Sequence, residues 1–268
     1  MLLTKNKTLR QIQGLLETFN PLFFKLLLKN PLKVRAFPGE VFRAYMSLVG
    51  KDKWMCKDIS DVFPGVEEAC KIVVEHLPSA DRSFPLRELA CLALITKVVK
   101  PMQVFEIGTY TGRTALNFAQ NSPEDCIVWT LDSPPTEAHT RTSAADDNIE
   151  RHTRASMDYK GKEAERKIRP LYSNCSAFDF SPYFGKIDMV FVNGAHHYEA
   201  VKSDTVNALR MAKPNGYVIW HDFANYGDCN DVTRAVLDTL SGDNVVQIAA
   251  TQLALFVQPS ETVNSYLK

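Results

Sequence analysis

The residues best suited to chemistry lie in a short segment with two glycines. Glu106 ends an apolar run, and Gly108 and Gly112 follow it before a helical pattern begins. Glycines let the backbone turn sharply and approach a ligand, and the first turn of a helix directs its unpaired N–H groups at that ligand. The carboxylate of Glu106 would repel a pyrophosphate bound at this turn. The segment therefore predicts a loop for a nucleotide-type cofactor whose head is positive or neutral.

A second carboxylate strengthens this interpretation. Asp132 ends the next apolar run, 127–131, about one strand-helix-strand unit further along the chain. An acidic side chain at the tip of the second strand is placed to accept both ribose hydroxyls of an adenosine-containing cofactor. Charge-assisted hydrogen bonds of this kind contribute about 1.5–3 kcal/mol each before ordering costs. Asp132 thus distinguishes the loop from the strand, turn and helix found in any α/β domain.

Two further apolar runs end in amide, imidazole and carboxylate groups. The first leads into Asn193 and His196, and the second leads into His221 and Asp222. Ligands of open parallel sheets bind outside the carboxyl ends of the strands, where these groups should meet Glu106. A single histidine at a strand end is more often a hydrogen-bonded packing residue than a catalyst. Several of them with carboxylates on neighbouring strand ends indicate a catalytic site.

Alternating apolar runs and helical segments predict the scaffold that positions these groups. Such alternation is typical of an α/β fold, with a mostly parallel sheet covered by helices on both faces. The last two apolar runs are joined only by Thr251 and Gln252, which predicts an antiparallel last strand. The predicted strands are 103–107, 127–131, 168–172, 187–192, 217–221, 245–250 and 253–258, and the helices between them are 112–120, 197–212 and 230–241.

Residues 1–82 are predicted to form a helical extension ahead of the domain 83–268. Further helices are expected at 67–74 and 86–99. Near the N-terminus, one helical face carries Leu9, Ile12, Leu15, Leu16 and Phe19. This face predicts packing against the main domain, cover of a substrate, or a homodimer contact through the N-terminal helices, in preference to binding at a membrane surface.

The segment 133–165 is polar and too long for an ordinary connection between a strand and the next element. It is rich in Thr, Ser, Asp, Arg and Lys. We expect either a lid or helical excursion beside the site, or a solvated surface loop.

The overall composition excludes several classes of function. Among 268 residues, 31 basic side chains balance 31 acidic ones, so no global field attracts nucleic acid. The apolar stretch 22–28 is interrupted by Lys25 and is much shorter than a membrane span of about 20 residues. The six cysteines stand singly, without the spacing of a zinc site. We expect no nucleic-acid partner, no stable membrane span and a cytoplasmic location.

From about Ser83 to Pro259, the sequence resembles the class I S-adenosylmethionine-dependent methyltransferases. The segment from Glu106 to Gly112 is similar to the cofactor motif of the catechol and caffeoyl-coenzyme A O-methyltransferase branch. Other segments resemble a bacterial group of small-molecule O-methyltransferases that typically reads GDS, FDFSPY, IDGAHSYE and WHDY in this order. These segments are Phe178–Tyr183, Gly194–Glu199 and Trp220–Asp222.

The resemblance implies a Rossmann-like, seven-stranded α/β sheet that binds S-adenosylmethionine and methylates a hydroxyl of a small molecule, as in secondary metabolism. It implies His196 as the general base, with His221 as the second candidate. Asn174 and Cys175 stand where the group has the Asp-Ser of GDS beside the adenine, so a carboxylate is lost there. The implied cofactor-binding residues are Glu106, Gly108, Thr109, Tyr110, Gly112, Asp132, Ser133, Asn174, Cys175 and Asn193.

Metal-dependent relatives hold magnesium with the Asp of IDG and with groups after the fifth strand. By the resemblance, the corresponding residues here are Asn193, His221 and Asp222. Hard magnesium prefers carboxylates and water, so the loss of one carboxylate weakens such a site. The sequence therefore favours a reaction without a metal.

Two other functions use the same residues. A protein that kept the fold without the chemistry is consistent with Asn174, Cys175 and Asn193, which replace the groups expected by the resemblance. A nicotinamide-dependent oxidoreductase would use the same loop, but the GxGxxG spacing is absent and Glu106 would face phosphate. Methyl transfer is the preferred interpretation.

Overall fold

The computed structural model describes residues 54–68, 71–75, 85–133, 158–225, 229–240 and 244–260. The chain divides into two compact units, Met1–Lys53 and Trp54–Lys268, and the description below concerns the second. The helical face expected near the N-terminus and most of the polar segment 133–165 lie outside the described residues.

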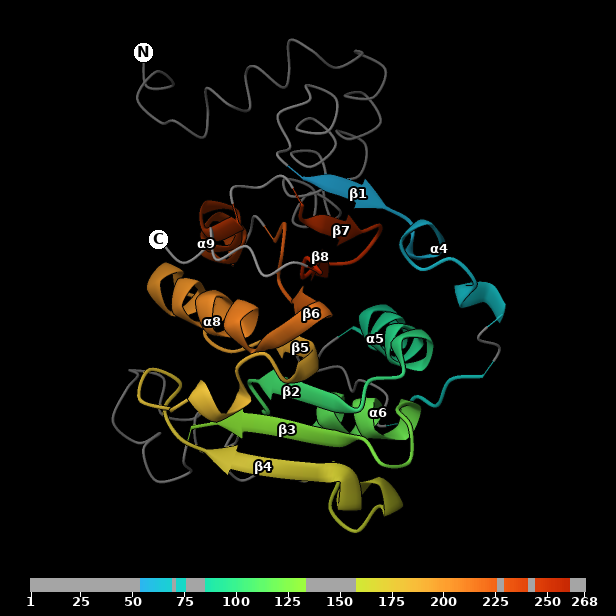
Figure 1. Ribbon diagram of the computed structural model, residues 1–268. Helices are drawn as coiled ribbons and strands as arrows, with labels where there is room; N and C mark the ends of the chain where they lie inside the picture. The colour runs from blue at the N-terminus through green and yellow to red at the C-terminus, as the bar shows by residue number, and fades with distance from the viewer. Residues whose placement is uncertain are drawn as a thin grey trace, which may run out of the picture. The chain divides into compact units, whose positions relative to one another are not determined.

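The second unit is built on a sheet of eight strands in the order β1-β7-β8-β6-β5-β2-β3-β4 (Figure 1). All neighbouring strands are parallel except β8, which runs antiparallel to both β6 and β7. The mostly parallel sheet and its antiparallel last strand are thus confirmed. The strands are β1 Met55–Lys57, β2 Gln103–Ile107, β3 Ile127–Asp132, β4 Ile168–Tyr172, β5 Ile187–Val192, β6 Ala212–Trp220, β7 Val246–Ile248 and β8 Ala254–Val257.

The sequence predicts seven strands, and the eighth is β1 at the edge of the sheet. Its three residues are all exposed, so they carry neither an apolar run nor an alternating pattern. Pairing with β7 forms the strand, and the N–H of Met55 donates to the carbonyl oxygen of Val245 at 3.2 Å. A strand defined by a partner almost two hundred residues away gives no local signal in the sequence.

Helices cover both faces of the sheet (Figure 1). Helices α5 and α6 share one apolar core with alternate side chains of the strands, and α8 and α9 share the other. On β2, Val104 faces the first core, whereas Phe105 and Ile107 face the second. The helices are α4 Ile59–Val62, α5 Leu86–Val99, α6 Arg113–Asn121, α8 Tyr198–Met211 and α9 Asn230–Leu240, with 3₁₀ helices η2 Val66–Glu68, η4 Glu163–Lys167 and η5 Ser181–Tyr183.

The helix expected at 67–74 is wrong. Of the described residues in this range, 67–68 belong to the 3₁₀ helix η2 and 71–74 are not helical. The side-chain amide of Asn121 exchanges hydrogen bonds with the backbone N–H and C=O of Val73, and that of Asn117 does the same with Glu75. The two amides of α6 thus satisfy the backbone of this segment, which removes the need for helical hydrogen bonds.

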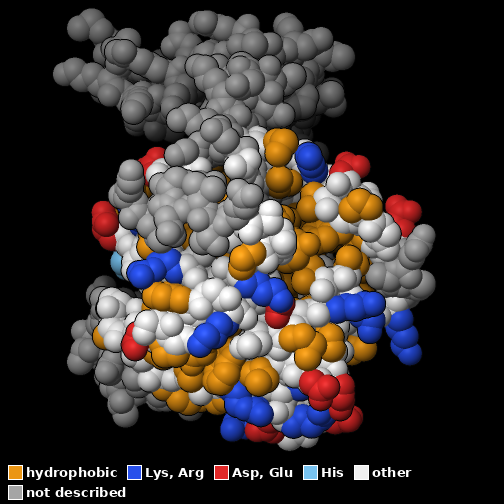
Figure 2. Space-filling view, viewed as in Figure 1, with side chains coloured by type: hydrophobic (Ala, Val, Ile, Leu, Met, Phe, Trp, Pro, Cys, Tyr) orange, Lys and Arg blue, Asp and Glu red, His pale blue; other side chains and the backbone are white. Residues whose placement is uncertain are grey.

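Charged and apolar side chains are mixed on the surface. On the face seen in Figure 2, lysine and arginine side chains of the described residues are scattered among acidic and apolar ones. Among the residues described, no helix combines the length and apolar content needed to cross a bilayer.

Candidate active site

The carboxyl ends of β2, β5 and β6 lie side by side and bring the polar groups of three segments together. Backbone hydrogen bonds continue past the strands, from the N–H of Asn193 to the carbonyl oxygen of Ile107 and from the N–H of His221 to that of Val192. The sheet therefore fixes the directions in which the chain leaves all three strands.

Gly108 directly follows β2 and lies against the backbone of Asn193, which follows β5. Its φ is +99°, and a Cβ built on it would be 2.1 Å from the carbonyl oxygen of Asn193. Gly112 has φ +83° and caps the N-terminus of α6. Only glycine satisfies both conditions at Gly108, the left-handed backbone and the close contact.

Glu106 is a fully buried carboxyl group at the end of β2. The hydroxyl of Thr130 donates to its Oε2, whereas its Oε1 has no hydrogen-bond partner among the described residues. Burial raises the pKa of Glu106 to about 8, against the hydrogen bond from Thr130, and the nearby charge of Asp132 adds to the rise. A buried oxygen without a partner is costly, so a cationic group beside it would be strongly favoured.

Asp132 ties the tip of β3 to the glycine loop. Its two carboxylate oxygens accept hydrogen bonds from the backbone N–H groups of Tyr110 and Ser133, each at 2.7 Å. The hydroxyl groups of Thr109 and Thr130 also lie 2.6 Å apart, which links the loop to the middle of β3. Each carboxylate oxygen of Asp132 keeps a further lone pair for a ligand hydroxyl.

Asn174 and Cys175 form a turn after β4. The side-chain oxygen of Asn174 accepts hydrogen bonds from the backbone N–H and the hydroxyl of Ser176, at 3.1 and 2.9 Å. An aspartate could accept the same two bonds, so the turn survives the exchange of carboxylate for amide. Burial raises the pKa of Cys175 to about 12, and the carboxylates of Asp204 and Asp132 add to the rise. Asn174 and Cys175 are therefore both uncharged beside this edge.

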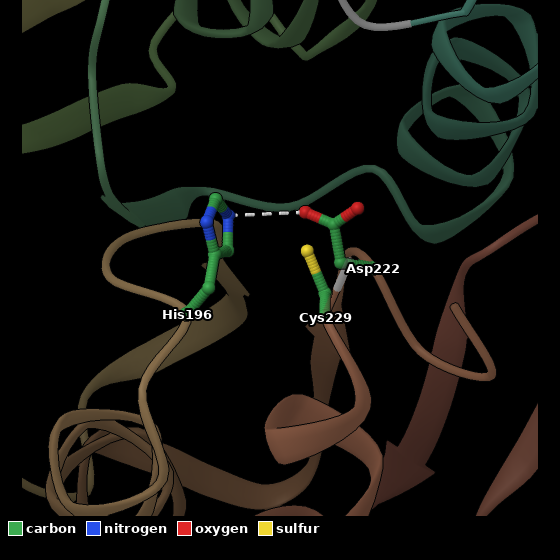
Figure 3. A group of neighbouring side chains, drawn as sticks. All are labelled: His196, Asp222 and Cys229. Atoms are coloured by element: carbon green, nitrogen blue, oxygen red, sulfur yellow. Dashed lines mark ion pairs between the residues drawn. The ribbon is translucent and has the colours of Figure 1, made fainter. Parts of the chain in front are cut away.

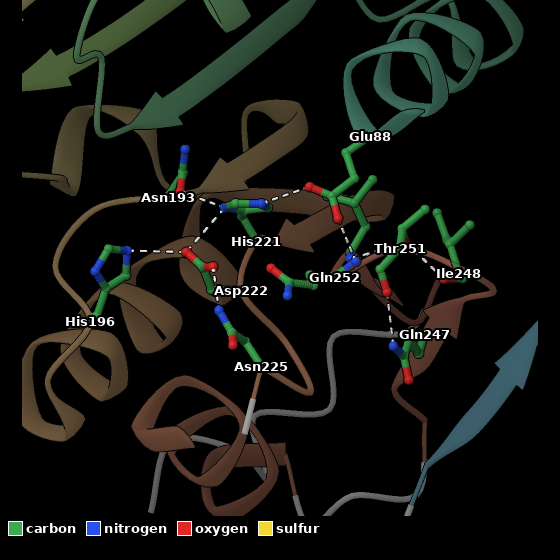
Figure 4. Close-up of polar contacts among 11 residues, drawn as sticks. Glu88, Asn193, His196, His221, Asp222, Asn225, Gln247, Ile248, Thr251 and Gln252 are labelled. Carbon is green, nitrogen blue, oxygen red and sulfur yellow. Dashed lines mark hydrogen bonds and ion pairs between the residues drawn. The ribbon is translucent and has the colours of Figure 1, made fainter. Parts of the chain in front are cut away.

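His221 is held between oxygen atoms on both sides of its ring (Figure 4). Nε2 lies 2.8 Å from Glu88 Oε2, and Nδ1 lies 3.1 Å from both Asp222 Oδ2 and Asn193 Oδ1. Burial would lower the pKa of His221, but the hydrogen bonds and charges of Asp222 and Glu88 outweigh it and raise the pKa to about 9. At neutral pH both ring nitrogens thus donate, and His221 is a cation.

Asp222 also holds His196. His196 Nε2 lies 3.1 Å from the same Oδ2 of Asp222, while the imidazole is half exposed. The other oxygen of Asp222 accepts a hydrogen bond from Asn225. Burial would raise the pKa of Asp222, but the hydrogen bonds from His196 and His221 hold it well below its usual range. Within the described part of the chain, Nδ1 of His196 has no partner, so its lone pair is accessible when Nε2 donates to Asp222.

The fold brings the residues predicted from the sequence together, but they do not all have the same function. Among the residues that the resemblance offers to a metal, His221 directly contacts both Asn193 and Asp222. His221 cannot ligate an ion in this state, because both of its nitrogens donate to protein oxygens. Its own positive charge lies between Asn193 and Asp222 instead.

Glu88 is the residue that sequence reasoning missed. It lies in the first turn of α5 and is buried, and its Oε1 accepts a hydrogen bond from the backbone N–H of Gln252 at 2.6 Å. One local signal exists in the sequence. Glu88 occupies the same helical face as Leu92 and Ile95, so a charge stands within an apolar stripe. Buried glutamate is rare without a partner, but the sequence does not tell which partner it has.

Residues 105–223 match the sequence profile of a family described as a methyltransferase domain. The match extends from the strand that carries Glu106 to the residue after Asp222, so it includes Asp132, His196 and His221 but not Glu88. This part of the chain is therefore similar in sequence to a methyltransferase domain. No curated protein matches the chain in sequence.

Three solved structures are similar to this chain. Cofactor-bound Rv0187 from MTB is 18% identical, with 76% of this chain and 90% of that chain covered and a TM-score of 0.48. SAH-bound methyltransferase PaMTH1 from Podospora anserina is 15% identical, with coverages of 84% and 97% and a TM-score of 0.47. The O-methyltransferase TomG from Streptomyces achromogenes, involved in tomaymycin synthesis and in complex with SAM, is 15% identical, with coverages of 82% and 96% and a TM-score of 0.46.

Proposed function

We propose that this protein transfers the methyl group of S-adenosylmethionine to a hydroxyl of a small molecule, with His196 as the general base. The observation that carries the proposal is the unpaired, buried oxygen of Glu106 beside the glycine loop. The cofactor has a cationic amino group that can donate a hydrogen bond to this oxygen and stabilise the ionised form of Glu106, whereas the pyrophosphate of a nicotinamide cofactor has no donor to offer it. The cofactors crystallised with TomG and PaMTH1 are of the same kind.

The residues around the loop fit this cofactor. Glu106 would accept a hydrogen bond from the amino group of the cofactor. The ribose hydroxyls would donate to the lone pairs of Asp132 that its hydrogen bonds with backbone N–H groups do not use. The remaining cofactor-binding residues are proposed as the sequence suggests, with Gly108, Thr109, Tyr110 and Gly112 along the methionine part, Ser133 at the ribose, Asn174 and Cys175 at the adenine, and Asn193 at the tip of β5.

When bound, the cofactor supplies a methyl group on a good leaving group, so alignment of the acceptor oxygen with that methyl group provides much of the acceleration. His196 removes the hydroxyl proton. Its Nε2–H remains donated to Asp222, Nδ1 accepts the proton, and Asp222 stabilises the resulting imidazolium. A positioned base of this kind contributes about 10²–10⁴-fold to the rate.

His221 is proposed to position Asp222 and not to accept the proton. Both of its ring nitrogens already donate to protein oxygens, so no lone pair points to a substrate. His196 is the better base because its ring is half exposed and Nδ1 is accessible.

The test is transfer of a radiolabelled methyl group from S-adenosylmethionine to a panel of phenolic and sugar hydroxyl compounds. We expect His196→Ala to lower kcat by about 10²–10⁴-fold on an acceptor that the wild type methylates. His197→Asn is the matched control, because His197 is the adjacent exposed imidazole and its role as N-cap of α8 is kept by asparagine. Equal activity of His196→Ala and wild type would contradict the assignment. Wild-type binding of the cofactor without methylation of any acceptor would favour a protein that binds but does not catalyse.

A further inference from the structure

We propose that His196, Asp222 and Cys229 bind a zinc ion or a similar divalent metal, and that the bound ion blocks methyl transfer. One ligand atom from each side chain lies within 4.8 Å of the others (Figure 3). Metal binding is argued from this geometry alone, whereas the block rests on the proposed function of His196.

The turn after β5 meets the segment between β6 and α9 to form the cluster. His196 lies in the turn after β5, Asp222 follows β6, and Cys229 immediately precedes α9 (Figure 3). His196 Nε2 and Asp222 Oδ2 are 3.1 Å apart. Ligand atoms of a tetrahedral zinc ion are about 3.3–3.8 Å apart, given bond lengths of about 2.0–2.3 Å. Small side-chain movements are therefore enough to place all three atoms around one ion.

The donor set selects for a particular class of metal. Imidazole nitrogen, carboxylate oxygen and thiolate sulfur are the ligands of zinc and related transition metals, whereas magnesium requires mainly oxygen atoms. Three protein ligands leave a fourth position open for water. Cys229 is buried and Asp222 nearly so, but His196 is half exposed, so an ion can enter along the His196 side.

This site differs from the metal position suggested by the sequence, because only Asp222 is common to both. His221 and Asn193 do not belong to this cluster. His221 contacts Asn193 and Asp222 through Nδ1. The scattered cysteines gave no indication of the cluster, since Cys229 and His196 are joined only through the fold.

Inhibition of methyl transfer follows from the position of the proton on the His196 ring. A metal on Nε2 of His196 takes the lone pair of that nitrogen, and the neutral ring then carries its proton on Nδ1. Asp222 is already ionised, and the thiol proton of Cys229 is released to solvent, so no oxidation or reduction is involved. With its proton on Nδ1, His196 can no longer accept one from the acceptor hydroxyl.

Cobalt(II) is the probe for binding, since it replaces zinc and gives thiolate-to-metal charge-transfer absorption when sulfur ligates it. Full-length protein is freed of metal with a chelator and titrated with cobalt, and zinc is then added as competitor. We expect binding of one ion, a charge-transfer band that zinc abolishes, and affinity at least tenfold weaker in both Cys229→Ser and His196→Asn. Cys56→Ala and His197→Asn remove an exposed thiol and an exposed imidazole elsewhere and should leave the titration unchanged.

Methyl transfer provides the second readout. We expect zinc to inhibit the wild type and to leave Cys229→Ser at least tenfold less sensitive, because Cys229 has no part in the proposed transfer, and magnesium not to inhibit either protein. The proposal is overturned by a titration without the charge-transfer band, by equal affinity of wild type and Cys229→Ser, or by equal inhibition of both. The cobalt titration decides the binding even if the protein methylates no acceptor, so failure of the proposed function is recognised separately.

Discussion

At the scale of single residues, the fold shifts the pKa values of two carboxyl groups in the site in opposite directions. Glu106 is a carboxyl group that burial tends to keep protonated, and Asp222 is one that two imidazoles keep ionised. The two carboxyl groups differ in their hydrogen-bond partners. Asp222 is surrounded by hydrogen-bond donors, whereas one oxygen of Glu106 has no donor beside it among the described residues. Glu106 is thus left for a ligand, and Asp222 is committed to holding imidazoles.

The protonation of Glu106 predicts a pH-dependent stability. Its pKa of about 8 in the folded chain compares with about 4.3 for an unfolded glutamate. Between these values the folded state binds more protons, so the free energy of unfolding falls as the pH rises toward 8, by a few kcal/mol in all. We expect Glu106→Gln to lack this fall and to gain stability over wild type from pH 5 to pH 9, measured by urea unfolding.

Glu67→Gln is the control for this measurement, because Glu67 is exposed. It should follow the wild-type pH profile. An identical profile for Glu106→Gln and wild type would show that the carboxyl of Glu106 ionises normally in the folded state.

At the scale of helices and strands, the buried side chain of Glu88 joins α5 to the active-site edge. Glu88 accepts hydrogen bonds from His221 after β6 and from the N–H of Gln252 between β7 and β8. Removal of one partner from a buried ion pair typically costs about 3–5 kcal/mol. We expect Glu88→Gln to destabilise the protein by roughly this amount, and His221→Asn to be destabilising as well.

A double-mutant cycle tests whether the two residues act as a pair. If they do, Glu88→Gln combined with His221→Asn costs clearly less than the sum of the single changes, as measured by urea unfolding. Additive costs would mean that the ion pair contributes nothing beyond the packing of the two side chains.

The contact between β2 and β5 predicts a strict requirement for glycine at position 108. Gly108→Ala would combine a left-handed backbone with a Cβ only 2.1 Å from the carbonyl oxygen of Asn193. Gly65→Ala is the matched control, because Gly65 has φ +86° but open space around its Cβ position. We expect Gly65→Ala to cost about 1–2 kcal/mol, and Gly108→Ala to cost more and to weaken cofactor binding. Equal losses of stability would contradict the close contact.

The sequence predicts the interior strands well and misses the edge strand β1. The strands 103–107 and 187–192 are confirmed to the residue, and the helix 86–99 likewise, because burial imposes an apolar pattern on each segment. β1 and the segment 71–75 were missed because distant partners determine them, namely β7 for the first and the amides of α6 for the second.

The same distinction applies to the site. The sequence predicts that six residues meet at one edge of the sheet, because each follows a strand and parallel strands have their carboxyl ends at the same edge. These residues are Glu106, Asp132, Asn193, His196, His221 and Asp222. Their assigned roles stay predictions. Glu88 and Cys229 come from other elements, and no spacing in the sequence connects them with the histidines that they approach.

At the scale of the whole molecule, two compact units divide the chain after Lys53. Our expectation of an extension 1–82 that packs, dimerises or covers the substrate remains a proposal. Choice of the acceptor is also proposed to depend on segments outside the sheet, because the strand ends provide the cofactor site and the base.

A reaction without a required metal predicts full activity in the presence of a chelator. We expect EDTA not to lower the rate of methyl transfer, since the positive charge of His221 already lies between Asn193 and Asp222. Loss of activity in EDTA that magnesium or manganese restores would contradict this. Zinc is expected to act only in the opposite direction, as an inhibitor.

The central claim is that the edge beside Glu106 binds S-adenosylmethionine, and calorimetric titration with S-adenosylhomocysteine tests it most directly. A charge-assisted hydrogen bond contributes about 1.5–3 kcal/mol, or roughly 10–150-fold in affinity. At pH 8 we expect one-site binding to the wild type and to Glu67→Gln, and binding at least about tenfold weaker to Glu106→Gln. Absence of binding to the wild type, or equal affinity for Glu106→Gln, would contradict the account.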